Sequence, residues 1–392
     1  MRLNACLLLA ALVSTTAAAT AAAPANPAPT SSAAQARDGV WTGTLGTSDI
    51  TVCLRGDEQH NGAYYYHKHL QPIQLNASAK SGAATLIMSE QAGAEPAKDA
   101  PVWQLELAGA GKMSGTWRAG AKQLPIQLAQ LPLSKADRDD GACSSNTYNA
   151  ALEKPARVAS RKARFGGAEY ELISLDFSKR FSAEISSFAL APTGAGVVKV
   201  NAALRKNLMA EQHNVFACSR AAREAHMDAD YNSNTTPEWI ASGWLVTVEQ
   251  ADNFCGGAHP NYGQSFATWN LERGEAVDPC TWFNATAVKL TVRGAGTPSA
   301  TNEVSIQPVL RSRLARGWAD VSEPDCADGL SGSDQQWQVR PVKEGMAFTP
   351  YLPHALTACV SDVVIPYAKL GPLLNQTGAA IVASLRAGAA RK

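Results

Sequence analysis

The chain has 392 residues, of which 45% are hydrophobic, and its 35 basic and 34 acidic side chains leave a formal net charge of +1. This length is sufficient for two domains with hydrophobic cores of their own. A chain so closely balanced in charge has no long-range field to attract nucleic acid or an anionic membrane surface, which argues against both as principal partners.

Residues 1–23 have the pattern of a secretory signal peptide. Arg2 supplies a positive n-region, Ala5 to Val13 form a short apolar core, and the alanines from Ala17 to Ala23 offer small-residue cleavage sites. A core this short does not reach the roughly 20 residues needed to span a bilayer, so no integral membrane segment is expected after cleavage. We therefore expect a periplasmic or secreted bacterial protein, with a flexible Ala/Pro/Ser/Thr-rich linker over residues 24–36.

A β-rich N-terminal domain is predicted over residues 37–150. Between Asp38 and Leu133, about eight short runs of strand-forming residues are separated by turn residues at roughly ten-residue spacing. Connections this short do not accommodate helical crossovers, so neighbouring strands are expected to be antiparallel. The pattern predicts a β-meander that forms a sandwich or a small barrel.

An α+β domain is predicted over residues 165–376. It follows a polar and basic segment, Ser134 to Arg164, that is interpreted as a second linker. An amphipathic helix is expected from about Gly196 to Ala225, and a second one follows Ser305. The strand-like segments around these helices are Tyr170–Leu175, Trp244–Glu249, Gln264–Trp269, Trp337–Val339, Met346–Phe348 and Val363–Ile365. Strands grouped with helices that cover one face favour an α+β sandwich.

Two stretches of this second region are recognisable. One runs from Phe254 to Gly263 and is followed by the turn Leu271–Glu275; the other is Asp362–Tyr367, preceded by Phe348–Tyr351. Together they resemble the RsiV-like family of extracytoplasmic domains of unknown function, over residues 169–375. In that family the domain occurs at the end of some peptidoglycan deacetylases and as the lysozyme-binding ectodomain of a membrane-bound anti-sigma factor.

The resemblance implies an extracytoplasmic α+β fold and suggests a lysozyme-like protein or peptidoglycan as a partner. It does not carry over the deacetylase chemistry, because the metal-binding Asp and paired His of those enzymes lie in a different domain and no H-x-x-x-H spacing occurs in the N-terminal half of this chain. No counterpart of the anti-sigma factor's membrane helix and sigma-binding segment is recognised either.

His259 is the one histidine that lies inside a motif-like turn. It is a candidate general base, and a hydrolase that uses His259 with nearby acids, or with Cys255, is an alternative function. Gly256 and Gly257 provide the backbone freedom of a tight strand connection, which favours a structural hairpin that also presents a recognition surface. The exposed residues expected to bind a partner are His259, Tyr262 and Tyr351.

Other patterns for chemistry are weak. His67 and His69 share one face of a predicted strand, with His60 nearby, but two ligands are too few for a closed metal site. Neither a phosphate-binding loop nor a serine-hydrolase elbow is found. No catalytic residue, metal or cofactor is therefore predicted.

Cysteine usage agrees with export. Of the eight cysteines, Cys6 lies in the signal peptide, and the remaining ones form no close C-x-x-C pair, so disulfides are expected in an oxidising compartment. The predicted pairs are Cys53–Cys143, Cys326–Cys359 and Cys255–Cys280. Cys218 is then the odd thiol, and its pairing with Cys255 or Cys280 is the main alternative.

The sequence thus favours a non-catalytic binding protein of the cell envelope. The two alternatives are the hydrolase that uses His259 and a small-ligand carrier in the N-terminal domain. The carrier follows from Gly39-x-Trp41, a feature of lipocalin-like barrels, and requires an apolar cavity lined by Tyr65, Trp103 and Trp117.

Overall fold

The computed structural model describes residues 36–56, 61–78, 81, 85–91, 99–225, 227–293, 301–321, 326 and 335–389. The predicted signal peptide, nearly all of the predicted linker and His60 lie outside these residues. Within the described residues, none of the helices combines the length and the apolarity needed to cross a membrane.

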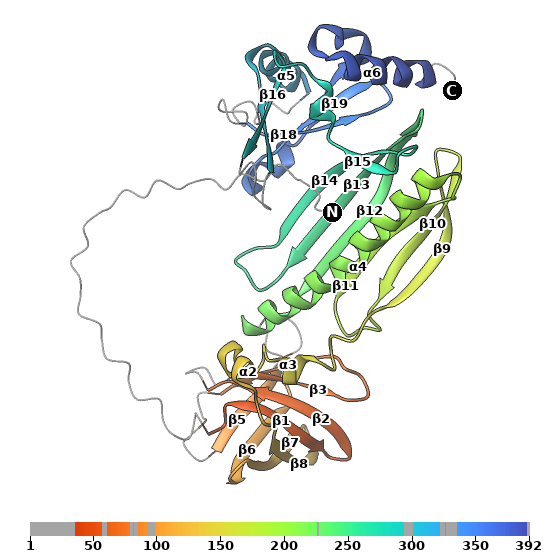
Figure 1. Ribbon diagram of the computed structural model, residues 1–392. Coiled ribbons are helices and arrows are strands. Elements are labelled where there is room, and N and C mark those ends of the chain that lie inside the picture. Colours follow the sequence, from red (N-terminus) through yellow and green to blue (C-terminus); the bar gives the residue numbers. More distant parts are fainter. Residues whose placement is uncertain are drawn as a thin grey trace, which may run out of the picture.

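Eight antiparallel strands form a closed barrel in the N-terminal part (Figure 1). Each strand pairs with the next one along the chain, and the first pairs with the eighth, which removes the exposed sheet edges. The strands are β1 (Gly39–Leu45), β2 (Ser48–Leu54), β3 (Gly62–Tyr66), β4 (Ile73–Ala77), β5 (Thr85–Gln91), β6 (Val102–Gly109), β7 (Lys112–Ala119) and β8 (Lys122–Gln130). The predicted antiparallel series is confirmed, and the pairing of β1 with β8 makes it a barrel.

Large side chains fill the barrel. Trp41, Tyr64 and Trp103 are at most 1% exposed and belong to one hydrophobic cluster, with 4.7 Å between the ring centroids of Tyr64 and Trp103. Along β6, Trp103 and Leu105 point inward while their neighbours are exposed, as the two-residue period of a strand requires. The interior is therefore a packed core.

The segment from Ser134 to Arg164, which was predicted to be a linker between the two domains, forms regular secondary structure instead. It contains the short helices α2 (Lys135–Asp140) and α3 (Asn146–Asn149), and its last part is a strand of the next sheet. Asp137 connects the two helices, since its buried carboxylate accepts hydrogen bonds from the Ser134 hydroxyl at 3.0 Å and from the Asn146 N–H at 2.7 Å. The polar composition reflects these caps, which satisfy backbone groups at helix ends.

A seven-stranded sheet follows, in the order β15-β14-β13-β12-β11-β10-β9. Its strands are β9 (Arg157–Phe165), β10 (Ala168–Asp176), β11 (Ala183–Leu190), β12 (Asp230–Ala241), β13 (Trp244–Phe254), β14 (Asn261–Asn270) and β15 (Glu275–Val277). Only β11 and β12 are parallel, because the helix α4 (Ala195–Glu224) forms the crossover between them. α4 confirms the predicted amphipathic helix and lies along one face of the sheet (Figure 1).

The rest of the chain builds a second core beyond one end of this sheet (Figure 1). Its described residues form the sheets β16-β17 and β18-β19-β20, together with α-helices and short 3-10 elements. The elements are a 3-10 helix (Pro279–Trp282), β16 (Val288–Arg293), β17 (Thr301–Ile306), α5 (Pro308–Val321), β18 (Trp337–Pro341), β19 (Gly345–Pro350), a 3-10 helix (His354–Cys359), β20 (Val363–Pro366), 3-10 turns at Tyr367–Lys369 and Gly371–Leu373, and α6 (Gln376–Ala389).

Residues Val382 and Leu385 of the terminal helix α6 are buried in the same cluster as Trp282 and Phe348. The α+β class of the chain is confirmed: an all-β barrel is followed by sheets that pack with helices.

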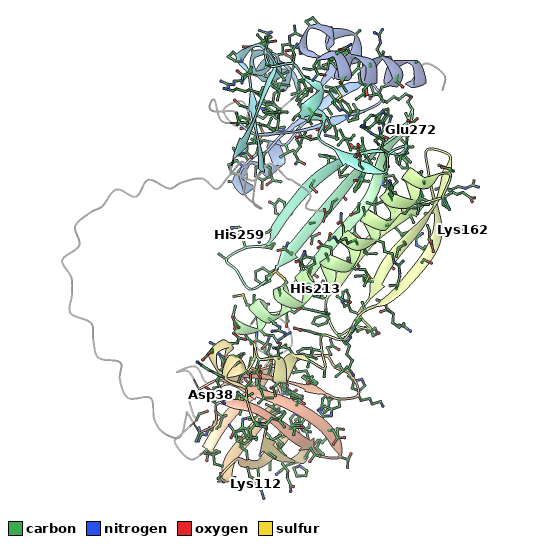
Figure 2. All side chains as sticks on the ribbon, in the orientation of Figure 1. Asp38, Lys112, Lys162, His213, His259 and Glu272 are labelled. Carbon is green, nitrogen blue, oxygen red and sulfur yellow. A yellow bond between two sulfur atoms is a disulfide. The ribbon has the colours of Figure 1, made fainter. Side chains whose placement is uncertain are left out.

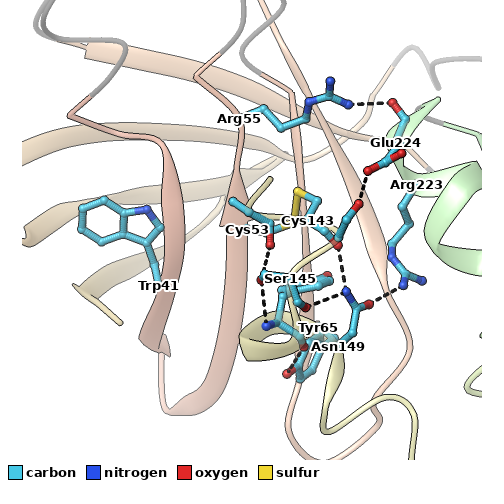
Figure 3. The surroundings of a disulfide bond; sticks show 12 residues. Trp41, Cys53, Arg55, Tyr65, Cys143, Ser145, Asn149, Arg223 and Glu224 are labelled. Carbon is cyan, nitrogen blue, oxygen red and sulfur yellow. Dashed lines mark hydrogen bonds between the residues drawn. A yellow bond between two sulfur atoms is a disulfide. The ribbon is translucent and has the colours of Figure 1, made fainter. Parts of the chain in front are cut away.

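The barrel contacts the C-terminal end of α4 (Figure 3). Arg55 Nη1 donates a hydrogen bond to the Glu224 carbonyl oxygen at 2.7 Å, and Arg223 donates one to the side-chain oxygen of Asn149. The Cys53–Cys143 disulfide ties the segment that contains α2 and α3 to strand β2. These contacts join the N-terminal barrel to α4, the helix that packs on the seven-stranded sheet.

Candidate functional site

The recognisable stretch that begins at Phe254 is the closed end of a long hairpin. Strands β13 and β14 pair continuously from Trp244 and Asn270 to Asn253 and Asn261. Both strands are longer than the sequence predicted, so the turn lies farther from the second core than the predicted strands would place it.

Gly256 is the residue that the turn requires. Its φ is +84°, and a Cβ atom added to it would lie 2.7 Å from the Cβ of Ala225 and 2.9 Å from the Cα of Ala222, at the end of α4. Gly257 differs, because a Cβ there would meet only the His259 carbonyl oxygen, at 3.9 Å. The turn therefore packs directly on α4 through Gly256, whereas Gly257 has room for a side chain.

A disulfide also holds the turn on α4. Cys255 is bonded to Cys218, with 4.7 Å between their Cα atoms. The predicted pair Cys255–Cys280 is therefore wrong: Cys280 is buried in the second core, in the same cluster as Trp282. The alternative partner, Cys218, is correct because the helix brings this residue beneath the turn. The pairs Cys53–Cys143 and Cys326–Cys359 are confirmed.

His259 lies at the hairpin end and is exposed (Figure 2). Its Nδ1 is 3.0 Å from the carbonyl oxygen of Pro260, a neutral backbone group. Because Cys255 is part of a disulfide, it does not supply the thiolate that a cysteine hydrolase needs beside an imidazole. The geometry suits a histidine presented to solvent.

The two tyrosines predicted to bind a partner are also exposed. Tyr262, at the start of β14, is 50% exposed, and Tyr351, directly after β19, is 65% exposed. The backbone of Tyr351 is fixed, since its N–H donates to the Gln336 carbonyl oxygen at 2.9 Å. Tyr262 thus shares the hairpin end with His259, while Tyr351 comes from the second core.

The sequence analysis missed a cluster of charged residues that includes Asp362, the first residue of the second recognisable stretch. Arg340, 3% exposed, donates to Glu238 at 2.8 Å and to Asp362 at 2.6 Å, and its guanidinium lies 3.6 Å from the ring centroid of Phe266. Its Nη1 also donates to the Thr349 hydroxyl. Asp362 and Thr349 belong to the recognisable stretches, so these residues join the second core to the seven-stranded sheet. Glu238 is 102 residues away from Arg340 in the chain, so no local pattern signals the contact.

A second polar group unseen in the sequence lies in the barrel. Oε1 of Glu90 accepts hydrogen bonds from Tyr64 Oη at 2.7 Å, from Trp103 Nε1 at 2.9 Å and from Trp117 Nε1 at 2.7 Å. Burial, together with the Glu90 carboxylate, raises the pKa of Tyr64. Each of the three aromatic groups thereby has a partner inside the protein.

The residues proposed to line a carrier cavity do not share one space. Trp103 and Trp117 point to the barrel interior, whereas Tyr65 packs on the outside, with its ring centroid 5.2 Å from that of Tyr148. The filled interior does not favour the carrier hypothesis.

The histidine pair considered for a metal takes another form. His67 and His69 lie in a turn after β3 instead of on a strand, and His67 Nε2 is 2.9 Å from the Thr51 hydroxyl. Over the residues that the structure describes, no three His, Cys, Asp or Glu side chains are grouped as metal ligands.

Neither a protein-family model nor a curated protein matches this chain. Two solved structures of DUF3298 family proteins match part of it. One, from Bacteroides fragilis, has 13% sequence identity and a TM-score of 0.39 over 59% of this chain and 96% of its own. The other, from Pseudomonas aeruginosa, has 12% identity and a TM-score of 0.33 over 58% of this chain and 98% of its own. The RsiV-like resemblance remains a prediction from the sequence.

Proposed function

We propose that this chain is a non-catalytic, extracytoplasmic protein that binds a component of the cell envelope through the end of the β13–β14 hairpin. The observation that carries the proposal is the way this end is held. Gly256 packs on α4 and the Cys218–Cys255 disulfide ties the turn to the same helix, while His259 and Tyr262 are presented to solvent.

A surface held in this way suits recognition. Binding costs free energy for every side chain and loop that becomes ordered, and a preformed loop has less to lose. Tyrosine combines a large contact area with few rotatable bonds, which is why it is frequent at the centre of interfaces. Tyr262 at the hairpin end and Tyr351 on the second core are the anchors we propose.

The compartment is proposed on separate grounds. Three disulfides suit an oxidising environment, and residues 1–23 have the pattern of a signal peptide. In this view the mature protein has a barrel domain over residues 37–150 and an RsiV-like domain over residues 165–376. The family resemblance suggests a lysozyme-like protein or peptidoglycan as the partner.

The test is a direct binding measurement. Immobilised protein is exposed to hen egg-white lysozyme in an interferometry assay, and soluble protein is sedimented with isolated peptidoglycan. We expect one of the two to bind, and the combined change His259→Ala, Tyr262→Ala and Tyr351→Ala to weaken that binding about ten-fold or more. The control is Val198→Ala, which truncates an apolar side chain that is 53% exposed at the start of α4.

Two outcomes would contradict the proposal. One is no binding of either probe by the folded wild-type protein. The other is hydrolysis of peptidoglycan or of an ester substrate that disappears with His259→Ala, which would replace the binding protein by the hydrolase.

A further inference from the structure

The seven-stranded sheet has one face against α4 and one face turned away from it. Side chains alternate between the two faces of a strand. Leu245 and Trp269 pack in one cluster with Leu204 of α4, and Tyr231 Oη donates to the Glu211 carboxylate of α4 at 2.8 Å. The odd-numbered residues of β13 and β14 therefore face α4, and the even-numbered ones face the other way.

The second core covers one end of this opposite face. Trp244 is buried in that core, and Trp239 packs against it. The boundary of the covered part is marked by Phe266, on which the Arg340 guanidinium is stacked, and by Gln338, whose side chain binds the backbone of β14.

Between this boundary and the hairpin end, the opposite face is polar and reaches solvent. Its side chains, which we call the polar face, are Asn232, Asn234, Gln250, Asp252, Tyr262 and Gln264. Those on β13 and β14 are exposed and those on β12 are half-buried, as far as the described residues show.

The strand register places these side chains in two rows. Asn234, Gln250 and Gln264 are neighbours across β12, β13 and β14, and Asn232, Asp252 and Tyr262 form the next row. Strand β11 extends both rows with Ser186 and Glu184. With neighbouring strands about 4.8 Å apart and successive rows about 7 Å apart, four strands and two rows make a surface of about 14 Å by 7 Å.

Part of this surface is held in place by its own hydrogen bonds. The Ser186 hydroxyl donates to Asn234 Oδ1 at 2.7 Å, and Asn232 Nδ2 donates to Asp252 Oδ1 at 2.9 Å. Ordered amide groups of Asn232 and Asn234 therefore lie in the half-buried floor, and the exposed Asp252 carboxylate and glutamines lie beside them. Such a surface has little to reorganise when a ligand arrives.

The chemistry of the polar face fits a ligand rich in hydroxyl groups. A carboxamide both donates and accepts hydrogen bonds, and a carboxylate accepts them, which complements hydroxyls in either role. The ring of Tyr262 adds one flat apolar surface beside these groups. The charged side chains of the two rows are the carboxylate of Asp252 and that of Glu184 on the adjoining β11, so the surface repels anions. Aromatic residues are enriched at the centre of protein interfaces, whereas Tyr262 is the one aromatic residue among the six side chains of the polar face, so the polar face itself favours a hydroxyl-rich ligand.

We infer that the polar face binds a neutral oligosaccharide chain. This inference rests on the proposed function, since it names the ligand class for the surface that adjoins the hairpin end. The bound oligosaccharide would lie across β12, β13 and β14, with its hydroxyl groups hydrogen-bonded to the two rows of amide side chains and one sugar ring against Tyr262.

The experiment uses the full chain with cellohexaose and chitohexaose as neutral probes and a sulfated hexasaccharide as the anionic one, measured by isothermal titration calorimetry. We expect at least one neutral probe to bind with a dissociation constant below about 1 mM, and the sulfated one to bind more weakly. The double change Gln250→Ala and Gln264→Ala should weaken binding about ten-fold or more, because each lost hydrogen bond contributes to the affinity.

Two controls test whether a loss of oligosaccharide binding is specific to the polar face. Gln127→Ala removes an exposed glutamine from a barrel strand and should leave oligosaccharide binding unchanged. Val198→Ala, the control of the preceding test, should also leave it unchanged. Absence of binding by both neutral probes, or an equal loss with Gln127→Ala, overturns the inference. If the protein binds lysozyme but no oligosaccharide, the inference about the polar face is wrong and the proposed function stands. If it binds none of the probes, both the inference and the proposed function are wrong.

Discussion

Replacing Gly256 with alanine should destabilise the protein by about 2–5 kcal/mol. The backbone at this position has a φ of +84°, a conformation that costs an L-residue about 1–2 kcal/mol. The added methyl group would also lie 2.7 Å from the Cβ of Ala225 and 2.9 Å from the Cα of Ala222. Relieving that overlap requires the turn to move away from α4, and such overpacking costs about 1–3 kcal/mol.

Gly257→Ala is the matched control for this change. The new methyl group has room there, and removing a glycine restricts the unfolded chain, so we expect no loss of stability. The free energy of unfolding is measured by urea denaturation, and hydrogen exchange of the turn is measured under native conditions. Equal stability of the two variants, or equal exchange protection at the hairpin end, would refute the argument that Gly256 holds the turn on α4.

Three further changes test the contacts that connect the elements. Replacing both Cys218 and Cys255 with alanine should lower the free energy of unfolding by about 4 kcal/mol, as expected for a disulfide across 37 residues, and an unchanged urea midpoint would argue against this pair. Arg340→Met should cost about 3–5 kcal/mol, because two partly buried carboxylates lose their cation, and a neutral effect would show that they are not coupled to it. Glu90→Ala should cost about 3 kcal/mol or more, since three aromatic donors lose their acceptor, and wild-type thermal stability would contradict that role.

The barrel could be predicted because its signals are local. Each strand shows strand-forming residues with a turn on either side, and along β6 the inward and outward side chains alternate visibly. The closing pair between β1 and β8 is not local, so the sequence left the choice between a sandwich and a barrel open. Similarly, α4 was predicted within one residue because its apolar spacing extends over many turns.

The missed elements have polar side chains that serve as caps and ion pairs. Helices α2 and α3 were hidden by a composition typical of linkers, although Asp137 uses that polarity to join them. Strand β9 was missed because it is an edge strand with little buried surface. Nearly all of its side chains are exposed, so its sequence shows no alternation of apolar and polar residues. Charged side chains on an edge strand also protect it from pairing with other chains. Because these residues occupy the positions that apolar residues would take in an inner strand, the hydrophobic pattern that identifies a strand is absent.

The candidate site was predicted in part, for the same physical reason. The turn around Gly256 was evident from its glycines, but its partner on α4 depends on how the helix packs, and this led to the wrong disulfide for Cys255. The polar face could not be found from the sequence at all. Its rows exist only through the register of β12, β13 and β14, which brings residues from different parts of the chain side by side.

Within the recognisable stretches, the residues that anchor the fold differ from those that we propose to bind a ligand. Cys255 and Gly256 join the hairpin to α4, and Asp362 joins the second core to the sheet through Arg340. All of them are fixed by packing, so a family resemblance based on them predicts the fold. The exposed even-numbered positions of β13 and β14, such as Gln250, meet no such constraint and can change without loss of the fold. Proteins that share the anchoring residues can therefore bind different ligands, and the ligand of this chain has to be inferred from the chemistry of its own polar face.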